Sequence, residues 1–248
     1  MSKVMLVTGA SRGIGAQIAL LAARQGWSVG VNYHRSADAA LELVREIGAD
    51  GGRAVALAAN VSRPEEVERM FAELDQAFGR VGALINNAGV LASFRLADAA
   101  PGQLEEVFRA NVFSAYYCAR EAIRRMSTRH GGPGGAILNM SSVASRLGGL
   151  GGGTAYAGSK GAIDSLTLAL AKEVGGEGIR VNALRPGLIE TEIHSVHGGL
   201  DQMRALARQS VPLGRSGTAQ EVAEVALWAV SEGASYVHGT CIDVAGGR

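Results

Sequence analysis

Tyr156 and Lys160 are the two side chains of this sequence best suited to proton chemistry, and they stand four residues apart. Apolar residues follow them at helical spacing, at Ile163, Leu166, Leu170 and Val174. On such a helix the phenol and the ammonium lie one turn apart on the same face. A nearby cation favours the phenolate and lowers the pKa of tyrosine from about 10. Because this spacing also arises by chance in many helices, the pair gains meaning only from the rest of the chain.

A glycine-rich segment near the start of the chain could bind phosphate groups. Gly9, Gly13 and Gly15 follow an apolar run at residues 4–7 and precede a helical pattern that stops near Gly26. A tight turn of this kind lets the backbone approach a pyrophosphate and points the amides of a helix N-terminus at anionic oxygens. The glycine spacing differs from the common dinucleotide fingerprint. A strand-to-helix turn without a ligand therefore stays open as an alternative.

Strand-like and helix-like segments alternate along the chain. Apolar runs predict strands at residues 4–7, 28–33, 54–58, 83–85, 136–140, 179–184 and 241–243. Helices are predicted from the glycine segment to Gly26, at 37–47, 64–78 and 103–129, from Tyr156 onward, and at 219–230, whereas 188–217 is irregular or helical. This alternation is typical of βαβ units with right-handed crossovers. We predict one α/β domain over residues 1–248, a doubly wound parallel sheet of about seven strands with helices on both faces.

The composition excludes several classes of function. Of the 248 residues, 47% are hydrophobic and 19% charged, and the formal net charge is +1. Without a long basic or acidic block, neither nucleic acid nor a membrane is an expected partner. Cys118 and Cys241 lack a CxxC spacing, so we expect no disulfide framework and no zinc site, and a reducing cytoplasm is the simplest compartment. We recognise no signal peptide and no apolar stretch long enough to span a bilayer.

One cluster could suggest a metal, because His194 and His197 lie near Glu190 and Glu192. Its spacing lacks a zinc pattern. We therefore expect surface polar side chains at these positions and no bound metal.

Seven motifs in register make the chain resemble the short-chain dehydrogenase/reductase family. They are the nucleotide loop Thr8–Gly15, Asn86–Gly89 after the fourth strand, Asn111 in the long helix, Ser142 after the fifth strand, Tyr156 with Lys160, Pro186–Gly187 after the sixth strand, and the closing segment Tyr236–Gly247. The resemblance spans the whole chain and implies a Rossmann-type fold. Within the family the chain looks most like bacterial 3-oxoacyl-carrier-protein reductases and sugar dehydrogenases.

The resemblance implies hydride transfer between nicotinamide and a small-molecule carbonyl or secondary alcohol. Tyr156 would act as acid or base, Lys160 would lower its pKa and bind the nicotinamide ribose, and Ser142 would stabilise the substrate oxygen. Asn111 would hold a water that connects Lys160 to solvent through a local break in its helix. A 3-oxoacyl-thioester-type reductase is the leading interpretation, and a sugar or other small-alcohol dehydrogenase is the alternative. A non-catalytic nucleotide-sensing protein or a structural subunit would not need these residues.

The resemblance also implies which residues contact the dinucleotide. Besides Tyr156 and Lys160 they are Gly9, Ser11, Arg12, Gly13, Ile14, Gly15, Tyr33, His34, Arg35, Asn60, Val61, Asn87, Ala88, Gly89, Pro186, Gly187, Ile189 and Thr191. At Asn60 the family often has Asp against the adenine amino group, and an Asn side-chain oxygen can accept the same hydrogen bond. A second departure is a run of glycines between Ser142 and Tyr156, which we interpret as a flexible spacer.

The end of the second predicted strand bears on the choice between NAD(H) and NADP(H). An NAD enzyme of this fold places Asp or Glu there to bind the ribose 2′-hydroxyl. Here the strand ends Val31-Asn-Tyr-His-Arg35, with no carboxylate before Asp38. Arg12 and Arg35 suit a 2′-phosphate, and His34 could assist when protonated. We predict NADP(H) over NAD(H), and the alternative is that both arginines are merely solvated.

Association and a substrate lid are further implications of the resemblance. The family commonly pairs subunits through two long helices. Here the helices with Asn111 and Tyr156 carry more apolar residues than one sheet face needs, so we predict a homotetramer, with a dimer second. Residues 188–217 would form the lid.

Several other residues have simpler explanations. Arg124, Arg125 and Arg129 could receive an acyl-carrier protein, although a solvated helix face is the favoured interpretation. We expect Arg185 to be structural and Cys118 to pack in the core. Aromatic residues of the long helix are expected to form one face of it, at Phe113, Tyr116 and Tyr117.

Overall fold

A seven-stranded parallel sheet forms the centre of the computed structural model, which describes residues 3–191 and 199–248. The strand order is β3-β2-β1-β4-β5-β6-β9, and it reverses between β1 and β4 as in doubly wound folds. In chain order the strands are β1 Val4–Val7, β2 Ser28–Tyr33, β3 Arg53–Ala58, β4 Ala83–Asn86, β5 Gly135–Met140, β6 Ile179–Pro186 and β9 Cys241–Val244. The predicted α/β class and the number of strands are confirmed.

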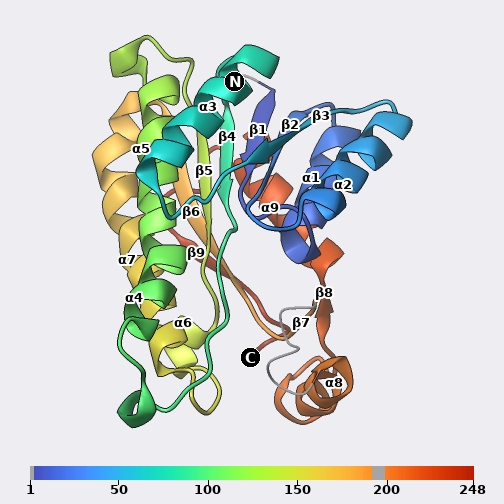
Figure 1. Cartoon of the computed structure of the whole chain (residues 1–248), viewed down its shortest axis with the longest axis vertical. Coiled ribbons are helices and arrows are strands. Elements are labelled where there is room, and N and C mark those ends of the chain that lie inside the picture. The colour runs from blue at the N-terminus through green and yellow to red at the C-terminus, as the bar shows by residue number, and fades with distance from the viewer. Residues whose placement is uncertain (1–2, 192–198) are drawn as a thin grey trace.

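Helices cover both faces of this sheet (Figure 1). The larger ones are α1 Gly13–Arg24, α2 Ala37–Ala49, α3 Pro64–Phe78, α5 Ser114–Met126, α7 Thr154–Val174 and α9 Ala219–Val230. α1, α2 and α9 form one hydrophobic core with the sheet, and α3, α5 and α7 form the other. Within β1, Met5 and Val7 belong to the first core and Leu6 to the second, because successive side chains of a strand point to opposite faces. Apolar side chains of the strands are therefore buried on both faces of the sheet.

The helix predicted over residues 103–129 is interrupted and ends earlier. It consists of α4 Gln103–Phe108, a π-helical turn at Arg109–Phe113, and α5, which stops at Met126. The expected local break at Asn111 is this π turn, a feature that is frequent at functional sites. The early end has a local cause, because the Ser127 hydroxyl accepts a hydrogen bond from the Arg129 amide and starts a separate 3₁₀ turn.

Smaller elements gather beyond the carboxyl ends of the strands, in the lower part of Figure 1. They are α6 Ala144–Leu147, β7 Ile189–Glu190, α8 Gly199–Ser210 and β8 Gly217–Thr218. The region 188–217, predicted to be irregular or helical, thus also contains a strand, since β7 pairs with β8 in a second small sheet. Met203 and Ala207 of α8 pack with Leu188 and Val211. Within the described parts of the chain, no helix has both the length and the apolarity needed to cross a membrane.

Candidate active site

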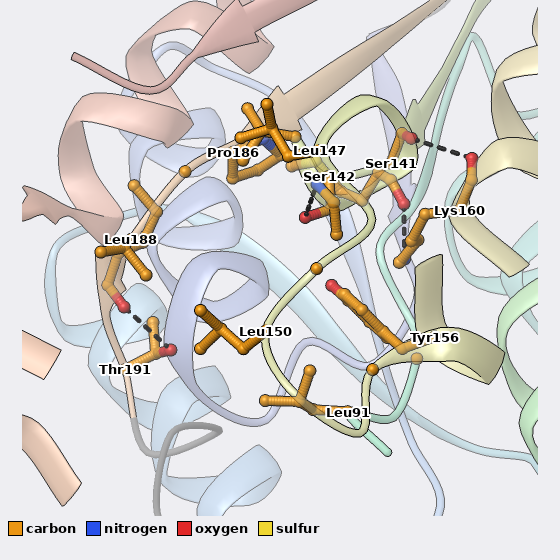
Figure 2. Close-up of a pocket in the computed structure, with 18 of the residues that line it drawn as sticks. Leu91, Ser141, Ser142, Leu147, Leu150, Tyr156, Lys160, Pro186, Leu188 and Thr191 are labelled. Carbon is orange, nitrogen blue, oxygen red and sulfur yellow. Dashed lines mark hydrogen bonds between the residues drawn. The ribbon is translucent and has the colours of Figure 1, made fainter. Parts of the chain in front are cut away.

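A pocket opens where the carboxyl ends of β4, β5 and β6 meet α7 (Figure 2). These strands lie on the far side of the reversal in strand order, where open α/β sheets bind ligands. The pocket brings together about half of the residues predicted for the site, which fits a single centre. Those among its lining residues are Ile14, Asn87, Gly89, Ser142, Tyr156, Lys160, Pro186, Gly187, Ile189 and Thr191.

Tyr156, Lys160 and Ser142 form the polar centre of this pocket. Both α7 residues lie on one helical face, with Lys160 Nζ 5.7 Å from the centroid of the Tyr156 ring. Lys160 is buried and donates a 2.7 Å hydrogen bond from Nζ to the Met140 carbonyl at the end of β5. In Figure 2 the hydroxyl of Tyr156 points toward Ser142. The Ser142 hydroxyl accepts a 3.1 Å hydrogen bond from the Ala144 amide, which holds the side chain in the first turn after β5.

The ionisation of this pair differs from the sequence expectation. Burial raises the pKa of Tyr156, and the nearby Ser142 hydroxyl only partly opposes the effect. Burial also lowers the pKa of Lys160 to about 8. Burial of the phenol therefore outweighs any lowering of the tyrosine pKa by the Lys160 charge, and the expected contribution of Lys160 stays a prediction. The phenol is the favoured form, so Tyr156 can give a proton at neutral pH.

Asn111 lies behind the pocket and fixes the loop after β4. Its Oδ1 accepts a 2.7 Å hydrogen bond from the Val90 amide, and its Nδ2 donates to the Val90 carbonyl and to Ser159 Oγ, both at 3.0 Å. A Cβ atom on Gly89 would lie 3.0 Å from Asn111 Oδ1 and 3.6 Å from Lys160 Nζ. Glycine at position 89 thus lets the asparagine and the lysine approach the same loop.

The glycine loop is held by two asparagine side chains. Asn32, buried at the end of β2, accepts a 3.0 Å hydrogen bond from the Gly9 amide. Asn87 Nδ2 donates to the carbonyls of Thr8 and Gly9 at 2.8 and 3.1 Å. The N-terminus of α1 has no side-chain cap and no acidic residue in its first turn. Its free amides and positive dipole end fit a phosphate group, so the segment suits the predicted dinucleotide.

Gly15 is expected to tolerate no side chain. An added Cβ would lie 2.5 Å from Asn87 Nδ2 and 2.8 Å from the Gly9 carbonyl oxygen. We expect Gly15→Ala to lower the free energy of unfolding by about 1–3 kcal/mol through overpacking. The matched control is Gly48→Ala on α2, where nothing lies within 4 Å and alanine should stabilise by about 0.5–1 kcal/mol. Thermal unfolding of both variants measures the difference, and equal shifts would contradict this packing.

The residues predicted for the adenosine end lie away from the pocket, around the ends of β2 and β3. Arg12, His34 and Arg35 are exposed and Tyr33 is half-buried. Neither Arg12 nor Arg35 forms an ion pair with any described residue. Asn60 Oδ1 already accepts a 3.0 Å hydrogen bond from the Ser62 amide, so an adenine amino group would use its second lone pair.

The other predicted cofactor residues surround the same loop. Gly13, at φ +59°, faces Thr191, and the Ala88 amide donates a 3.0 Å hydrogen bond to Thr8 Oγ1. Ser11 is half-buried, and Val61 is buried against the second core.

Leucine side chains form much of the pocket wall, which the sequence did not predict. Leu91 follows the loop after β4, Leu147 ends α6, Leu150 lies in the glycine run, and Leu188 follows Gly187 (Figure 2). The glycine run is not a mere spacer, because the Phe94 amide donates a 2.9 Å hydrogen bond to the Gly152 carbonyl. The sequence feature that could have predicted this wall is the presence of apolar residues within a glycine-rich loop. Nothing in the sequence marked Arg248, which also lines the pocket.

Most of the residues with simpler explanations behave as expected, but Arg125 is not on a solvated face, since its side chain is only 17% exposed and lies over the Phe71 ring. Cys118 is fully buried, and Arg185 pairs with Asp164 at 2.9 Å. Phe113 and Tyr116 are largely exposed and Tyr117 packs on the second core. The arginines of α5 and the turn after it are paired with carboxylates at the amino end of the strands, far from the pocket. These pairs are Arg124–Glu121, Arg125–Asp75 and Arg129–Glu177.

The predicted metal alternative falls partly outside the described residues. Glu192, His194 and His197 belong to the stretch at 192–198 that the structure does not describe. Glu190 is paired with Arg204 at 2.6 Å. Elsewhere in the described chain, no three His, Cys, Asp or Glu side chains form a group that could hold a metal ion.

Comparisons with known proteins agree with this fold. A family model described as enoyl-(acyl carrier protein) reductase matches residues 9–248. The Escherichia coli protein called "Uncharacterized oxidoreductase YgfF" is 45% identical over 246 residues, covering 99% of each chain. The 3-oxoacyl-[acyl-carrier-protein] reductase FabG of Staphylococcus epidermidis is 34% identical, covering 100% of this chain and 99% of the relative. The crystal structure of acetoin dehydrogenase YohF from Salmonella typhimurium superposes with a TM-score of 0.88 at 34% identity, covering 100% of this chain and 97% of that one.

A doubly wound sheet with this pocket and these relatives defines a class of nicotinamide-using oxidoreductases. The chain belongs to the short-chain dehydrogenase/reductase family.

Proposed function

We propose that the protein transfers a hydride between NADP(H) and a carbonyl or secondary alcohol, with Tyr156, Ser142, Lys160 and Asn111 as the catalytic residues. The observation that carries the proposal is the convergence of the Tyr156 ring, the Ser142 hydroxyl and the buried Lys160 ammonium in one pocket. A nucleotide-sensing protein or a structural subunit would have no use for this arrangement.

Each side chain has a separate task in carbonyl reduction. The bound nicotinamide supplies or accepts the hydride. Tyr156 donates its proton to the oxygen of the substrate as negative charge develops there. The Ser142 hydroxyl donates a hydrogen bond to that oxygen and stabilises the charge. Lys160 stabilises the phenolate that Tyr156 leaves behind, and Asn111 holds the loop that borders the lysine.

The preference for NADP(H) rests on the charges around the end of β2. A ribose 2′-phosphate needs cations and no carboxylate. Asn32 is the next-to-last residue of β2. Its side chain accepts a hydrogen bond from the Gly9 amide and donates to the carbonyls of Leu57 and Ala59. Arg12 and Arg35 remain exposed and free to bind phosphate with charge-assisted hydrogen bonds.

A 3-oxoacyl-thioester-type substrate is favoured by the apolar pocket wall. Beyond the residues assigned to cofactor and catalysis, the described lining is apolar apart from Ser141 and Arg248. Leu91, Leu147 and Leu150 suit an acyl chain better than the hydroxyl groups of a sugar. The name of the Staphylococcus relative agrees with this choice, whereas the acetoin dehydrogenase favours the alternative, a small-alcohol dehydrogenase.

Turnover of a substrate panel tests this choice. We expect the Michaelis constant to fall as the acyl chain of 3-oxoacyl thioesters lengthens, because each buried methylene contributes about 0.8 kcal/mol. Leu150→Ser should raise it for long chains and leave the shortest one unchanged. Leu41→Ser, on the exposed outer side of α2, is the matched control. Faster turnover of sugars or acetoin than of every thioester would exclude the acyl proposal.

The lid proposal concerns residues 188–217. Leu188, Ile189 and Thr191 line the pocket, and α8 follows the undescribed stretch. Ser216 and Arg204 both bind Glu190, at 2.7 and 2.6 Å. Among the described residues, these contacts tie β7 to α8 and to the residue that precedes β8.

We also propose a homotetramer in a reducing, cytoplasmic compartment. Leu104, Phe113 and Tyr116 on α4–α5 and Leu168 on α7 are largely exposed apolar side chains, which suits pairing through these helices. Both cysteines are free. Light scattering at micromolar protein should give the mass of four chains, or of two as the second choice. A monomer mass would contradict the assembly.

A further inference from the structure

A third ionisable side chain, Asp164, follows Lys160 on α7 at the same spacing that separates Lys160 from Tyr156. Residues four apart lie one above the other on a helix. Tyr156, Lys160 and Asp164 therefore form a row along α7 that leads away from the pocket. The mechanism above gives the first two a task and leaves Asp164 without one.

Asp164 is held in a buried ion pair. Its Oδ2 accepts hydrogen bonds from Arg185 Nε at 3.0 Å and Nη2 at 2.9 Å. The two side chains are only 13% and 18% exposed. The other oxygen, Oδ1, is buried and has no hydrogen-bond partner among the described residues. Ser141 and Ser145 lie close to the carboxylate, but their hydroxyls donate to the carbonyls of Lys160 and Ser142.

The Asp164–Arg185 pair connects α7 to β6 and, through further ion pairs, to β9 and α6. Arg185 directly precedes Pro186 on β6 and reaches Asp243 of β9 at 3.6 Å. Asp243 also pairs with Arg146 of α6 at 2.7 Å. Charges alternate along this series, so each member is stabilised by its neighbours. A bare structural pair would not need an unpartnered carboxylate oxygen on the residue one helical turn from the catalytic lysine, because such an oxygen is costly to bury.

We propose that Asp164 is a positioning residue of the active site: its buried carboxylate, held by Arg185, keeps Lys160 charged and fixes α7 against the strand that leads to Pro186. The proposal rests on the proposed role of Lys160. It assigns Asp164 and Arg185 a task in setting the charge of the pocket.

The charges near Lys160 determine the direction of the effect. Burial lowers the pKa of Lys160 to about 8, and the negative charge of Asp164 opposes this. Burial would raise the pKa of Asp164, but Arg185 holds it below its ordinary value, so the carboxylate is charged at neutral pH. Removing that charge must lower the lysine pKa further. The ionisable side chains that face this cluster are Tyr156 from α7, Arg185 from β6, and Cys241 and Asp243 from β9.

The chain offers a direct measurement, because Lys3, Lys160 and Lys172 are its only lysines. In protein labelled with isotope at the lysine side-chain ε-carbon, NMR can follow each lysine through a pH titration, with Lys3→Arg and Lys172→Arg giving the assignment. We expect Lys160 to titrate near pH 8 in the parent protein. In Asp164→Asn, which keeps the shape and removes the charge, the midpoint of Lys160 should move to lower pH. A midpoint about one pH unit lower corresponds to a tenfold smaller ratio of charged to neutral lysine.

Three variants separate charge from structure. Asp243→Asn removes a charge from the same series without touching Lys160, and we expect its lysine midpoint to stay near that of the parent. Arg185→Lys should keep the parent midpoint, and Arg185→Leu should move it upward, because the carboxylate loses its partner. An unchanged midpoint in Asp164→Asn, with parent-like circular dichroism, would overturn the proposal. If Asp164→Asn fails to fold, Arg185→Leu alone tests the proposal. An upward shift of the Lys160 midpoint supports it, and an unchanged midpoint overturns it.

Kinetics provide the second readout. The basic limb of the pH profile of kcat should move to lower pH in Asp164→Asn, whereas Asp243→Asn should leave it in place. The NMR titration needs no substrate and no turnover. A protein without oxidoreductase activity would therefore fail the proposed function and still report whether Asp164 sets the charge of Lys160.

Discussion

Tyr156→Phe is expected to lose nearly all turnover while it still binds the cofactor. The substitution keeps the ring and removes the only proton that the pocket can give from this position. General acid–base catalysis contributes at least about 10²-fold, which corresponds to about 2.7 kcal/mol of transition-state stabilisation. Steady-state rates measure the loss, and fluorescence titration with NADPH measures binding.

Tyr236→Phe provides the control for this prediction. Its side chain is fully exposed, so removing the hydroxyl should leave the rate unchanged. If the Tyr156→Phe protein turns over within a few-fold of the parent, Tyr156 is not the acid. If it also loses NADPH binding, the ring has a structural task that the mechanism does not include.

Arg12→Ala with Arg35→Ala is expected to change the cofactor preference. Each guanidinium can form charge-assisted hydrogen bonds to a 2′-phosphate, worth about 1.5–3 kcal/mol, and about 1.4 kcal/mol is a factor of ten in affinity. We therefore expect the Michaelis constant for NADPH to rise at least about tenfold per arginine. The constant for NADH should change little, since its 2′-hydroxyl carries no charge.

Arg45→Ala tests whether net charge alone explains such a result. Arg45 is exposed on α2 and pairs with Glu42 at 2.7 Å, so its loss should leave both constants unchanged. Tyr33→Asp adds the missing carboxylate at the end of β2 and should favour NADH. Equal weakening of both cofactors in the double variant would refute the assignment.

The fold was predictable because its signals are local. Each strand is an apolar run bounded by turn residues, and Pro64 starts α3 where its missing N–H costs nothing. One of the errors has a local cause and the other a non-local one. The hydrogen bond at Ser127 ended the long helix early, and pairing across the sequence made a strand of Ile189–Glu190.

Residues of the site could be predicted only where they belong to a motif of residues close together in the sequence. The Tyr156–Lys160 spacing and the glycine loop could be read along the chain. The direction of the Tyr156 pKa shift could not be read along the chain, because it depends on burial by segments that are distant in the sequence. The contact of Lys160 with the Met140 carbonyl joins residues 20 positions apart, and the Asp164–Arg185 pair joins two elements 21 positions apart. Leu91 and Leu188 lie far apart in the sequence and line the same pocket only because of the tertiary fold.

The most direct test of the proposed NADP(H)-dependent carbonyl reduction is the initial rate of cofactor oxidation by the parent protein. The rate is followed by absorbance at the reduced nicotinamide band, with 3-oxoacyl thioesters as substrates and NADPH or NADH as the hydride donor. We expect rapid oxidation of NADPH that depends on the carbonyl substrate, and a much higher kcat/KM with NADPH than with NADH. Binding of NADPH without oxidation by any carbonyl in the panel, or equal use of both cofactors, would contradict it.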